Sequence, residues 1–386
     1  MKRFLFFLLP LPILFFAQEI NWNLMGSGAR AMGMGGAFIS VADDASSILW
    51  NPAGIAQLIK PEISFCGSFR LEDWSTAEGY SDYSYTHFLV DHASVVLPFS
   101  LGGGRVVFSF AYHPILDWYR LDTDTISEYW GDYLYYRKLS GPFSSFAPAL
   151  GFNMGQFSLG ASFDLWKFGP KYYEYEKYDS AGFAYEYEYN EKNNPSSIGI
   201  NLGALYTSEM FRFGGVIRLP HTLKQHIEWE KTMTGDINYD SSGTIEGSEI
   251  GFPMMFGFGG SVILANALTI ALDYEIRPYS KMTINGATYT NVYDCNQLRV
   301  GLEYMFNIEK FALPLRVGYM TDPKTYADKN GHVVGNAFTG GMGFVFDRIS
   351  FDIATYYMFS NELYEGMSEE GTYTRFHIYL STAIRL

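Results

Sequence analysis

The chain lacks long apolar runs. Beyond its first seventeen residues it has no uninterrupted hydrophobic stretch of the ~18 residues that a transmembrane helix needs. Hydrophobic residues nevertheless make up 48% of the sequence, with a mean hydropathy of −0.04. Apolar side chains are therefore spread along the chain, and any membrane span must be built from strands.

Cysteine and positive charge are also scarce. The two cysteines, Cys66 and Cys295, show no CxxC or Cys/His spacing, so we expect no zinc site, no disulfide and no cofactor. The 27 basic residues are outnumbered by 41 acidic ones, giving a net charge of −14. A surplus of carboxylates argues against a nucleic-acid partner.

Catalytic motifs are missing as well. The seven histidines are scattered, and neither H-E-x-x-H nor G-x-S-x-G is present. His377 and Ser381 share one face of the last predicted strand, but a spacing of four residues is too long for a direct hydrogen bond. We expect a protein that is not an enzyme.

The N-terminus reads as a targeting signal. Lys2 and Arg3 precede an apolar core over residues 4–16, and Ala17 offers a small residue for cleavage before Gln18. This order is typical of a secretory signal peptide. We assign residues 1–17 to the signal and expect the mature chain to begin near Gln18.

From Pro61 onward the sequence falls into segments of about ten residues with period-2 alternation, the length of a tilted strand that crosses a bilayer. In residues 267–276, for example, Leu272 and Tyr274 fall on an apolar face while Asp273 and Glu275 fall on a polar one. The pattern predicts an all-β fold, a transmembrane antiparallel barrel over residues 60–386. We expect about fourteen strands, at residues 61–70, 89–99, 104–113, 143–154, 156–167, 196–206, 210–219, 251–263, 267–279, 296–306, 313–321, 336–347, 348–359 and 374–386.

The connections alternate in length. Tight turns alternate with long loops, which follow Arg70, His113, Lys167, Leu219, Tyr279, Thr321 and Phe359. Since short turns face the periplasm in such barrels, both chain ends should lie there. A soluble β-sandwich or propeller would have shorter strands, and the strand length favours the barrel.

Aromatic residues are abundant, at 18% of the chain. Two predicted outer loops hold Trp118, Tyr119, Tyr129, Trp130 and Tyr133, and Tyr172, Tyr173, Tyr175, Tyr178, Phe183, Tyr185, Tyr187 and Tyr189. The candidates for capturing an apolar ligand are Trp118, Tyr119, Trp130, Tyr173, Tyr175 and Phe183. The alternative, which we favour, is that the alternation of residues 185–189 only extends a hairpin above the membrane.

Charged residues are predicted on the water-facing side of several strands. Arg218, Arg299 and Arg316 are candidate partners for a fatty-acid carboxylate, because guanidinium binds carboxylate bidentately. The favoured alternative is structural: polar lumens usually satisfy their charges internally, here with Asp273, Glu275 and Glu303 among others.

Residues 25–54 fit no strand pattern. They are rich in glycine and alanine, and Asp43 or Asp44 can cap a short helix over residues 45–49 that Pro52 ends. Glycine suits a compact coil in a confined space. We predict that residues 18–59 form a hatch, a short helix plus coil, that plugs the lumen. The match of residues 26–31 to a dinucleotide-binding G-x-G-x-x-A lacks the required βαβ context.

The stretches GARAMGMGGAF (residues 28–38) and ADDASSILWNPAG (residues 42–54) resemble the N-terminal hatch of FadL-type outer-membrane transporters of long-chain fatty acids and hydrocarbons. They resemble equally the related PorV type, which serves a secretion system. The most specific element is the triplet Asn51, Pro52 and Ala53. The resemblance carries over to these residues and to the hatch glycines Gly26, Gly28, Gly33, Gly35 and Gly36.

The resemblance implies a bacterial outer-membrane, multi-pass barrel that passively admits hydrophobic molecules such as long-chain fatty acids, gated by the hatch. Its expected partners are outer-membrane lipid, the barrel-assembly machinery and a hydrophobic small-molecule ligand. FadL-type transporters release ligand sideways through a gap in the wall, which the motifs here do not place. The alternative function is PorV-like docking of secreted proteins.

Overall fold

The structure, a computed structural model, describes residues 21–24, 26–76, 83–128, 131–180, 182–290, 292–363 and 370–386. The predicted signal peptide and the candidate Trp130 lie outside these residues. No helix in the described ranges is long and apolar enough to cross a membrane.

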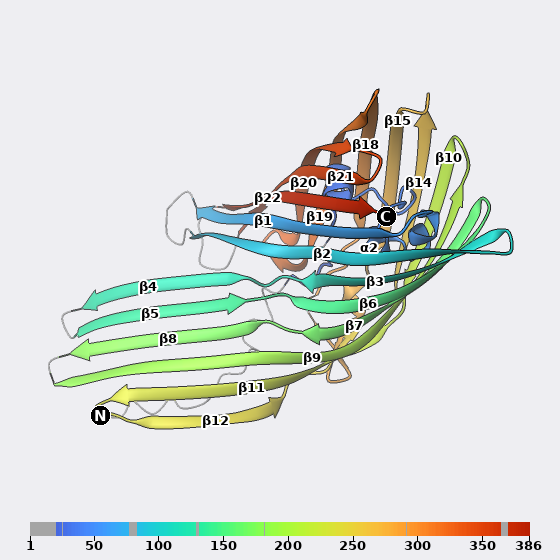
Figure 1. Cartoon of the computed structure of the whole chain (residues 1–386). Helices are drawn as coiled ribbons and strands as arrows, with labels where there is room; N and C mark the ends of the chain where they lie inside the picture. Colours follow the sequence, from blue (N-terminus) through green and yellow to red (C-terminus); the bar gives the residue numbers. More distant parts are fainter. Residues whose placement is uncertain are drawn as a thin grey trace.

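A closed antiparallel barrel of fourteen strands forms the body of the molecule (Figure 1). It closes where β1 pairs with β22, from Glu62 opposite Arg385 to Thr76 opposite Gly371. The barrel strands are β1 (Glu62–Thr76), β2 (Tyr83–Leu101), β3 (Gly104–Leu116), β6 (Phe143–Met154), β7 (Phe157–Phe168), β9 (Phe183–Thr207), β10 (Phe211–Arg218), β14 (Met255–Leu264), β15 (Leu268–Ile276), β18 (Gln297–Ile308), β19 (Phe311–Asp328), β20 (Gly331–Val345), β21 (Ile349–Glu362) and β22 (Gly371–Arg385). The predicted fold class is confirmed.

The alternation of apolar and polar residues places one set outside and the other inside. On β15, Leu272 is 54% exposed whereas Asp273 is fully buried. Large apolar side chains are exposed on the outer surface of the strands, among them Phe99, Phe108 and Leu380. A closed barrel with an apolar outer surface and a polar interior is a multi-pass outer-membrane architecture.

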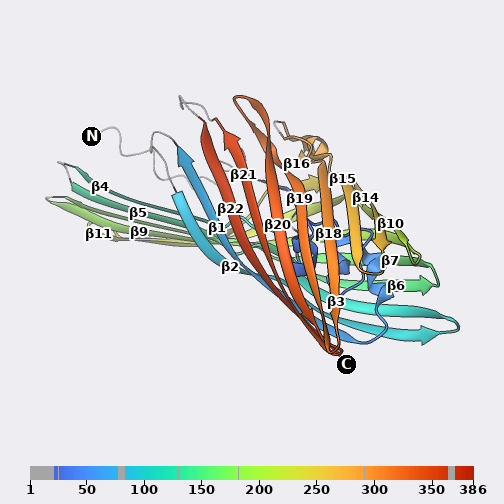
Figure 2. The same cartoon turned by 90° about the horizontal axis from the view of Figure 1, so that it is seen from above.

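Three of the predicted long loops are ordered as strands. A six-stranded sheet, called the extension here, continues one side of the barrel (Figures 1 and 2). It consists of β4 (Arg120–Glu128), β5 (Gly131–Ser140), β8 (Lys171–Ser180), the outer part of β9, β11 (His221–Gly235) and β12 (Tyr239–Glu246). Cross-strand pairing satisfies the backbone groups that a loop would leave to water. Residues 185–189 lie on β9 and pair with β8 and β11, so their backbone agrees with the predicted hairpin rather than with a loop.

Smaller elements complete the outer rim. They are β13 (Ile250–Phe252), η3 (Tyr279–Lys281), β16 (Thr283–Ile284) and β17 (Ala287–Thr288). The long loop expected after Thr321 is instead a continuation of β19 to Asp328, which turns directly into β20 at Gly331.

The N-terminal segment fills the lumen. It holds α1 (Ala29–Gly33), α2 (Ser47–Trp50) and η2 (Pro52–Gln57), joined by turns. Asp44 accepts hydrogen bonds from the backbone and hydroxyl groups of Ser46, just before α2. The α2 helix begins at Ser47, two residues later than predicted. Pro52 follows the end of α2, as predicted, and is also the first residue of η2, the helical position that tolerates proline.

Glycines of the wall bring the hatch backbone against the strands. A Cβ added at Gly203 of β9 would overlap Asn51 Oδ1, and one at Gly160 of β7 would overlap the Pro52 backbone. The same close approach recurs at Gly214 of β10 and Gly318 of β19. Absence of side chains at these positions lets the hatch backbone pack directly on the wall.

Candidate functional site

The triplet of residues 51–53 fastens the hatch to the wall. Asn51 Nδ2 donates to the carbonyl oxygens of Ile39, within the hatch, and Ala204, on β9, at 2.9 and 3.0 Å. Asn51 Oδ1 accepts from the Ala53 amide at 3.1 Å, which caps η2. One buried amide side chain thus joins two hatch segments and a strand, and Pro52 fixes the backbone of the first helical turn.

Other hydrogen bonds attach the hatch around the lumen. Thr339 of β20 accepts from the Gly35 amide at 2.9 Å and donates to the Gly33 carbonyl at 3.1 Å. Asp273 of β15 accepts from the Ile39 amide at 2.7 Å, and Ser381 of β22 accepts from Ala29 at 2.8 Å. The hatch is therefore attached to opposite sides of the wall.

The predicted hatch glycines lie at its tightest points. Gly28, Gly35 and Gly36 have φ of +90°, +63° and +68°, which favour glycine. A Cβ on Gly26 would lie 2.6 Å from the Trp50 ring, and one on Gly33 would lie 3.3 Å from Gly341 Cα.

A chain of ion pairs links the hatch to the β18–β21 side. Arg30 of the hatch pairs with Asp43 and, at 3.0 Å, with Glu303 of β18. Arg316 of β19 pairs with the same Glu303 and with Asp352 of β21, both at 2.6 Å. This candidate arginine therefore already has two carboxylate partners.

A second cluster surrounds Glu275, which is 1% exposed. Arg277 and Arg299 each lie 2.8 Å from its carboxylate, and Arg218 lies 3.2 Å away. Arg299 also stacks over the Trp50 ring at 5.2 Å. The structure thus brings two of the three candidates, Arg218 and Arg299, to one carboxylate, while Arg316 stands apart from them. Arg277 was not anticipated from the sequence.

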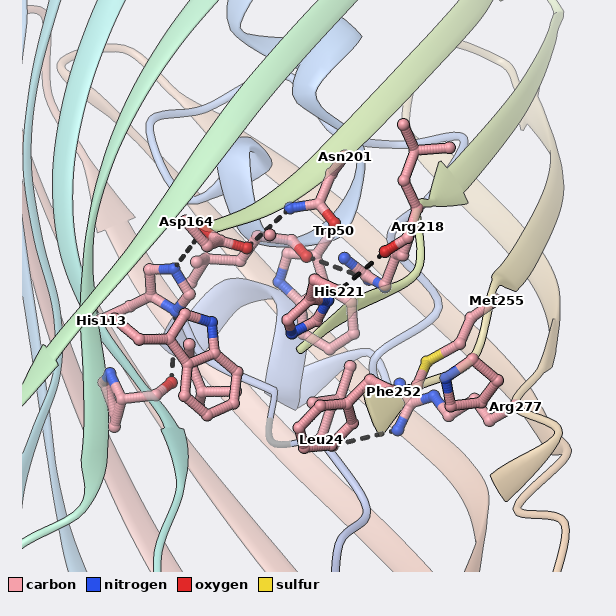
Figure 3. A pocket seen from close by; sticks show the side chains of 17 residues that line it. Leu24, Trp50, His113, Asp164, Asn201, Arg218, His221, Phe252, Met255 and Arg277 are labelled. Atoms are coloured by element: carbon pink, nitrogen blue, oxygen red, sulfur yellow. Dashed lines mark hydrogen bonds and ion pairs between the residues drawn. The ribbon is translucent and has the colours of Figure 1, made fainter. Parts of the chain in front are cut away.

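A cavity of about 60 Å³, called the upper cavity here, is bounded by the hatch and mainly by the wall strands β3, β7, β9 and β10 (Figure 3). Its lining comprises Leu24, Leu49, Trp50, His113, Pro114, Ile115, Asp164, Trp166, Gly199, Asn201, Arg218, Leu219, His221, Phe252, Pro253, Met255 and Arg277. A cavity of roughly 150 Å³ can hold benzene, so an aromatic solute would fit here only if lining side chains moved.

The polar groups of the upper cavity are mostly paired. Asp164 accepts from Asn201 Nδ2 at 2.8 Å and contacts His113 Nε2 at 3.0 Å. Ser145 Oγ lies 2.9 Å from that same His113 nitrogen, so the serine and the aspartate do not occupy opposite ring nitrogens as a catalytic triad requires. His221 Nε2 has no hydrogen-bond partner.

Aromatic rings cover the upper cavity. Trp22, near the start of the hatch, packs edge-on against Trp118 at 4.9 Å and against Phe252 at 5.9 Å. Trp166 lies 5.7 Å from Phe252, whose ring stacks on His221 at 5.0 Å. Of the predicted capture residues, Trp118 belongs to this cluster, whereas Tyr119 stacks on His87 of β2.

A lower cavity of about 170 Å³ lies on the other side of the hatch. The residues that line it include Arg30 and Asp44 of the hatch and Glu62 and Arg316 of the wall, and none of these lining residues is Phe, Tyr or Trp. The hatch therefore separates a cavity that is lined by aromatic rings from one whose lining has charged residues and no Phe, Tyr or Trp.

The extension divides the remaining capture candidates between its faces. Odd-numbered residues of β9 face the lumen side, as buried Asn193 and Asn201 show. Through the strand register, this inner face carries Tyr133, Tyr135, Tyr172, Tyr178, Phe183, Tyr185, Tyr187, Tyr189, Trp229 and Tyr239. Tyr173 and Tyr175 lie on the opposite face, among exposed charges such as Lys177 and Glu186. These two do not join Phe183 in one surface.

The described residues contain no cluster of three or more His, Cys, Asp or Glu side chains that could hold a metal ion. Cys66 and Cys295 are free thiols.

No family model matches the chain, and no curated protein matches it. Solved structures share its fold over nearly its whole length. A Pseudomonas aeruginosa FadL homologue has a TM-score of 0.60 and 13% identity, covering 95% of this chain and 99% of that one. The Pseudomonas putida toluene transporter TodX has a TM-score of 0.57 and 13% identity, covering 95% and 100%. The Ralstonia pickettii toluene transporter TbuX has a TM-score of 0.57 and 14% identity, covering 94% and 99%.

At these identities the similarity shows the fold. The chain has the fold of FadL-type barrels, so the resemblance drawn from the hatch sequence is confirmed at that level. The proteins named above are described as transporters or FadL homologues rather than enzymes.

Proposed function

We propose that the chain is a plugged outer-membrane channel that passively admits hydrophobic small molecules, with the hatch of residues 18–59 as its gate. The observation that carries the proposal is the stacking of the upper cavity, the hatch and the lower cavity along one lumen. Leu49 and Trp50 of the hatch line the upper cavity, and Arg30 and Asp44 line the lower one.

The aromatic surfaces support an apolar solute. Aromatic side chains line the inner face of the extension, and an aromatic cluster of Trp22, Trp118, Trp166 and Phe252 covers the upper cavity. Apolar pockets with few polar groups are typical of small-molecule sites. TodX and TbuX, which share the fold, are described as toluene transporters. The PorV-like docking function finds no such support among these structures.

Long-chain fatty acids are the finer proposal. Of the three candidate arginines, Arg218 lines the upper cavity, where a fatty-acid carboxylate could exchange with Glu275 as its partner. Arg218→Gln should lower oleate uptake severalfold while leaving toluene uptake unchanged. Equal uptake of oleate by the variant and the wild type would remove Arg218 from this role.

The function itself is tested by uptake in cells that express the chain. Labelled toluene and oleate should enter faster than in cells with an empty vector, while a polar solute of similar size should not. Deletion of residues 26–54 should give a conducting pore in planar bilayers. If uptake matches the empty vector, the channel function is wrong; if the deletion leaves both conductance and uptake unchanged, the hatch is not the gate.

A further inference from the structure

Glu191 on the inner face of the extension is a buried carboxylate without a cationic partner in the described chain. It is 5% exposed, and no Lys, Arg or His side chain forms an ion pair with it. Its Oε2 accepts one hydrogen bond, from the Tyr189 hydroxyl at 3.0 Å, while its Oε1 has no partner. Two residues along the same face, the buried Asn193 Oδ1 also lacks a donor.

Several other carboxylates of the extension have cationic partners. On the same inner face, Glu174 is paired with Arg137 at 3.0 Å. On the exposed outer face, Glu186 is paired with Lys177 at 2.9 Å and Glu228 with Lys192 at 3.5 Å. Taking a carboxylate out of water without a counter-charge is costly, so buried carboxylates are normally paired. Glu191 departs from that rule, and a counter-charge supplied from outside the chain would restore it.

The surroundings of Glu191 are aromatic. Its cross-strand neighbours are Tyr172 on β8 and Trp229 on β11, the strands that flank β9 in Figure 1. The Tyr172 and Tyr189 rings meet edge to face, 6.0 Å apart. Lys231, which is the cross-strand neighbour of Tyr189 on β11, places its ammonium over the Trp229 and Tyr239 rings, 5.5 and 5.1 Å from their centroids.

We propose that Tyr172, Tyr189, Glu191 and Trp229 form a binding site for an organic ammonium group. Aromatic faces attract cations through the ring quadrupole, and quaternary ammonium ligands are recognised by cages of such rings. Glu191 would supply the opposite charge, and Asn193 Oδ1 a further acceptor for ligands that carry N–H groups. The site is independent of the proposed uptake function, because it requires only binding.

Choline and its uncharged isostere 3,3-dimethyl-1-butanol are matched probes, since they differ in the ammonium charge. Binding to the purified full-length protein in non-ionic detergent is measured by calorimetry near pH 7.5. Choline should bind the wild type at least tenfold more tightly than the alcohol, as expected for a desolvated cation–π contact with a carboxylate.

Glu191→Gln keeps the size of the side chain and removes its charge, so choline affinity should fall tenfold or more. Glu188→Gln changes an exposed carboxylate on the other face of the same strand and should leave affinity unchanged. Trp229→Leu removes the aromatic ring but keeps an apolar side chain, so choline affinity should fall severalfold.

Folding of each variant is checked by the mobility of the unheated barrel in SDS gels; should Glu191→Gln fail to fold, the Trp229→Leu variant and the uncharged probe carry the test. Equal affinity for choline and the alcohol, or unchanged choline affinity in Glu191→Gln, would overturn the proposal.

Discussion

At the scale of single residues, glycines of the wall set the distance between hatch and barrel. Gly151, Gly160, Gly203, Gly301 and Gly318 each leave room for hatch atoms that a Cβ would displace. The nearest hatch atoms at these positions belong to the backbone or to the short side chains of Asn51 and Ile55. Such close packing leaves little room for adjustment, so small additions of volume should destabilise it.

Two adjacent glycines of β10 test this tightness. A Cβ at Gly214 would overlap the Ile39 carbonyl oxygen, whereas one at Gly215 has its nearest neighbour 4.0 Å away. Gly214→Ala should destabilise hatch packing by about 1–3 kcal/mol, as overpacking does. We expect intermittent conductance in planar bilayers for Gly214→Ala and none for Gly215→Ala. If neither variant conducts in planar bilayers, the hatch accommodates the added methyl group without opening the lumen.

The charge of Glu191 gives the proposed ammonium site a pH dependence. Burial raises the pKa of this carboxyl, and the Tyr189 hydroxyl offsets part of the rise. The other groups near it are Tyr172 and Glu174 on β8 and Lys231 on β11; burial also raises the pKa of Tyr172 and Tyr189, which stay neutral. The ionised carboxylate binds the cation, so affinity should be full at high pH and fall as pH drops through the raised pKa.

Choline titrations between about pH 4 and pH 8 measure that midpoint, which should lie above the ordinary glutamate value of about 4.3. The residual binding of Glu191→Gln serves as the control and should be flat over this range. A midpoint at or below the ordinary value would show that Glu191 is solvated when the ligand binds.

For single side chains, the sequence predicts which face of a strand each occupies but not which partner it contacts. Alternation identifies which residues face the lumen, so Arg218, Arg299 and Arg316 were placed inside correctly. It does not identify their partners: Glu275 of β15 is paired with Arg277 just after its own strand, with Arg299 of the adjacent strand β18 and with Arg218 of β10, one strand beyond β14. Several lumen-facing charges lie close together on these strands, and their side-chain directions, which alternation leaves open, decide the pairs. The mid-strand glycines on polar faces were a readable signal for the close hatch contacts, since glycine inside a strand often marks an approaching backbone.

At the scale of elements, the fastening of the hatch depends on residues 51–53. Removing the Asn51 side chain loses the cap of η2 and leaves the Ile39 and Ala204 carbonyls without their amide donor. A lost cap costs about 1 kcal/mol and each buried unpaired group about 1–3 kcal/mol. Asn51→Ala should therefore weaken the local structure of the hatch by at least about 2 kcal/mol.

Amide hydrogen exchange measures this locally. A loss of about 2 kcal/mol corresponds to exchange roughly thirtyfold faster, and we expect that acceleration at Ile39 and Ala53 with little change in the barrel strands. Asn307→Ala, at an exposed position on β18, is the matched control. Equal protection of the hatch in both variants would mean that other bonds hold it.

Contact with lipid decides which strands can be predicted from the sequence. Fourteen barrel strands follow from a strict period of two, because each has lipid on one side and the lumen on the other. The extension lies above the membrane, where both faces can be polar or aromatic, and β11 and β12 were therefore assigned to loops. Tyr173 and Tyr175 were grouped with Phe183 for the same reason, since neighbours in a loop have no fixed faces.

At the scale of the whole molecule, gating requires that the hatch move relative to a wall that closes on itself through β1 and β22. The wall has no free edge along this seam, and the upper cavity is too small for an aromatic solute. If the chain is the channel proposed above, passage through the lumen requires that hatch residues move, and a covalent link between hatch and wall should block it.

Gly33 of the hatch and Gly341 of β20 are suited to such a link. A Cβ on Gly33 would lie 3.3 Å from Gly341 Cα, and one on Gly341 would lie 3.2 Å from Gly33 Cα, so the two positions face each other in direct contact between hatch and wall. The double variant Gly33→Cys, Gly341→Cys should take up toluene slowly when oxidised and recover after reduction, while each single variant should be insensitive to redox conditions. Buried Cys66 and Cys295 remain as thiols in all forms. Uptake that is equally fast in the oxidised and reduced double variant would place the solute path elsewhere than through a moving hatch.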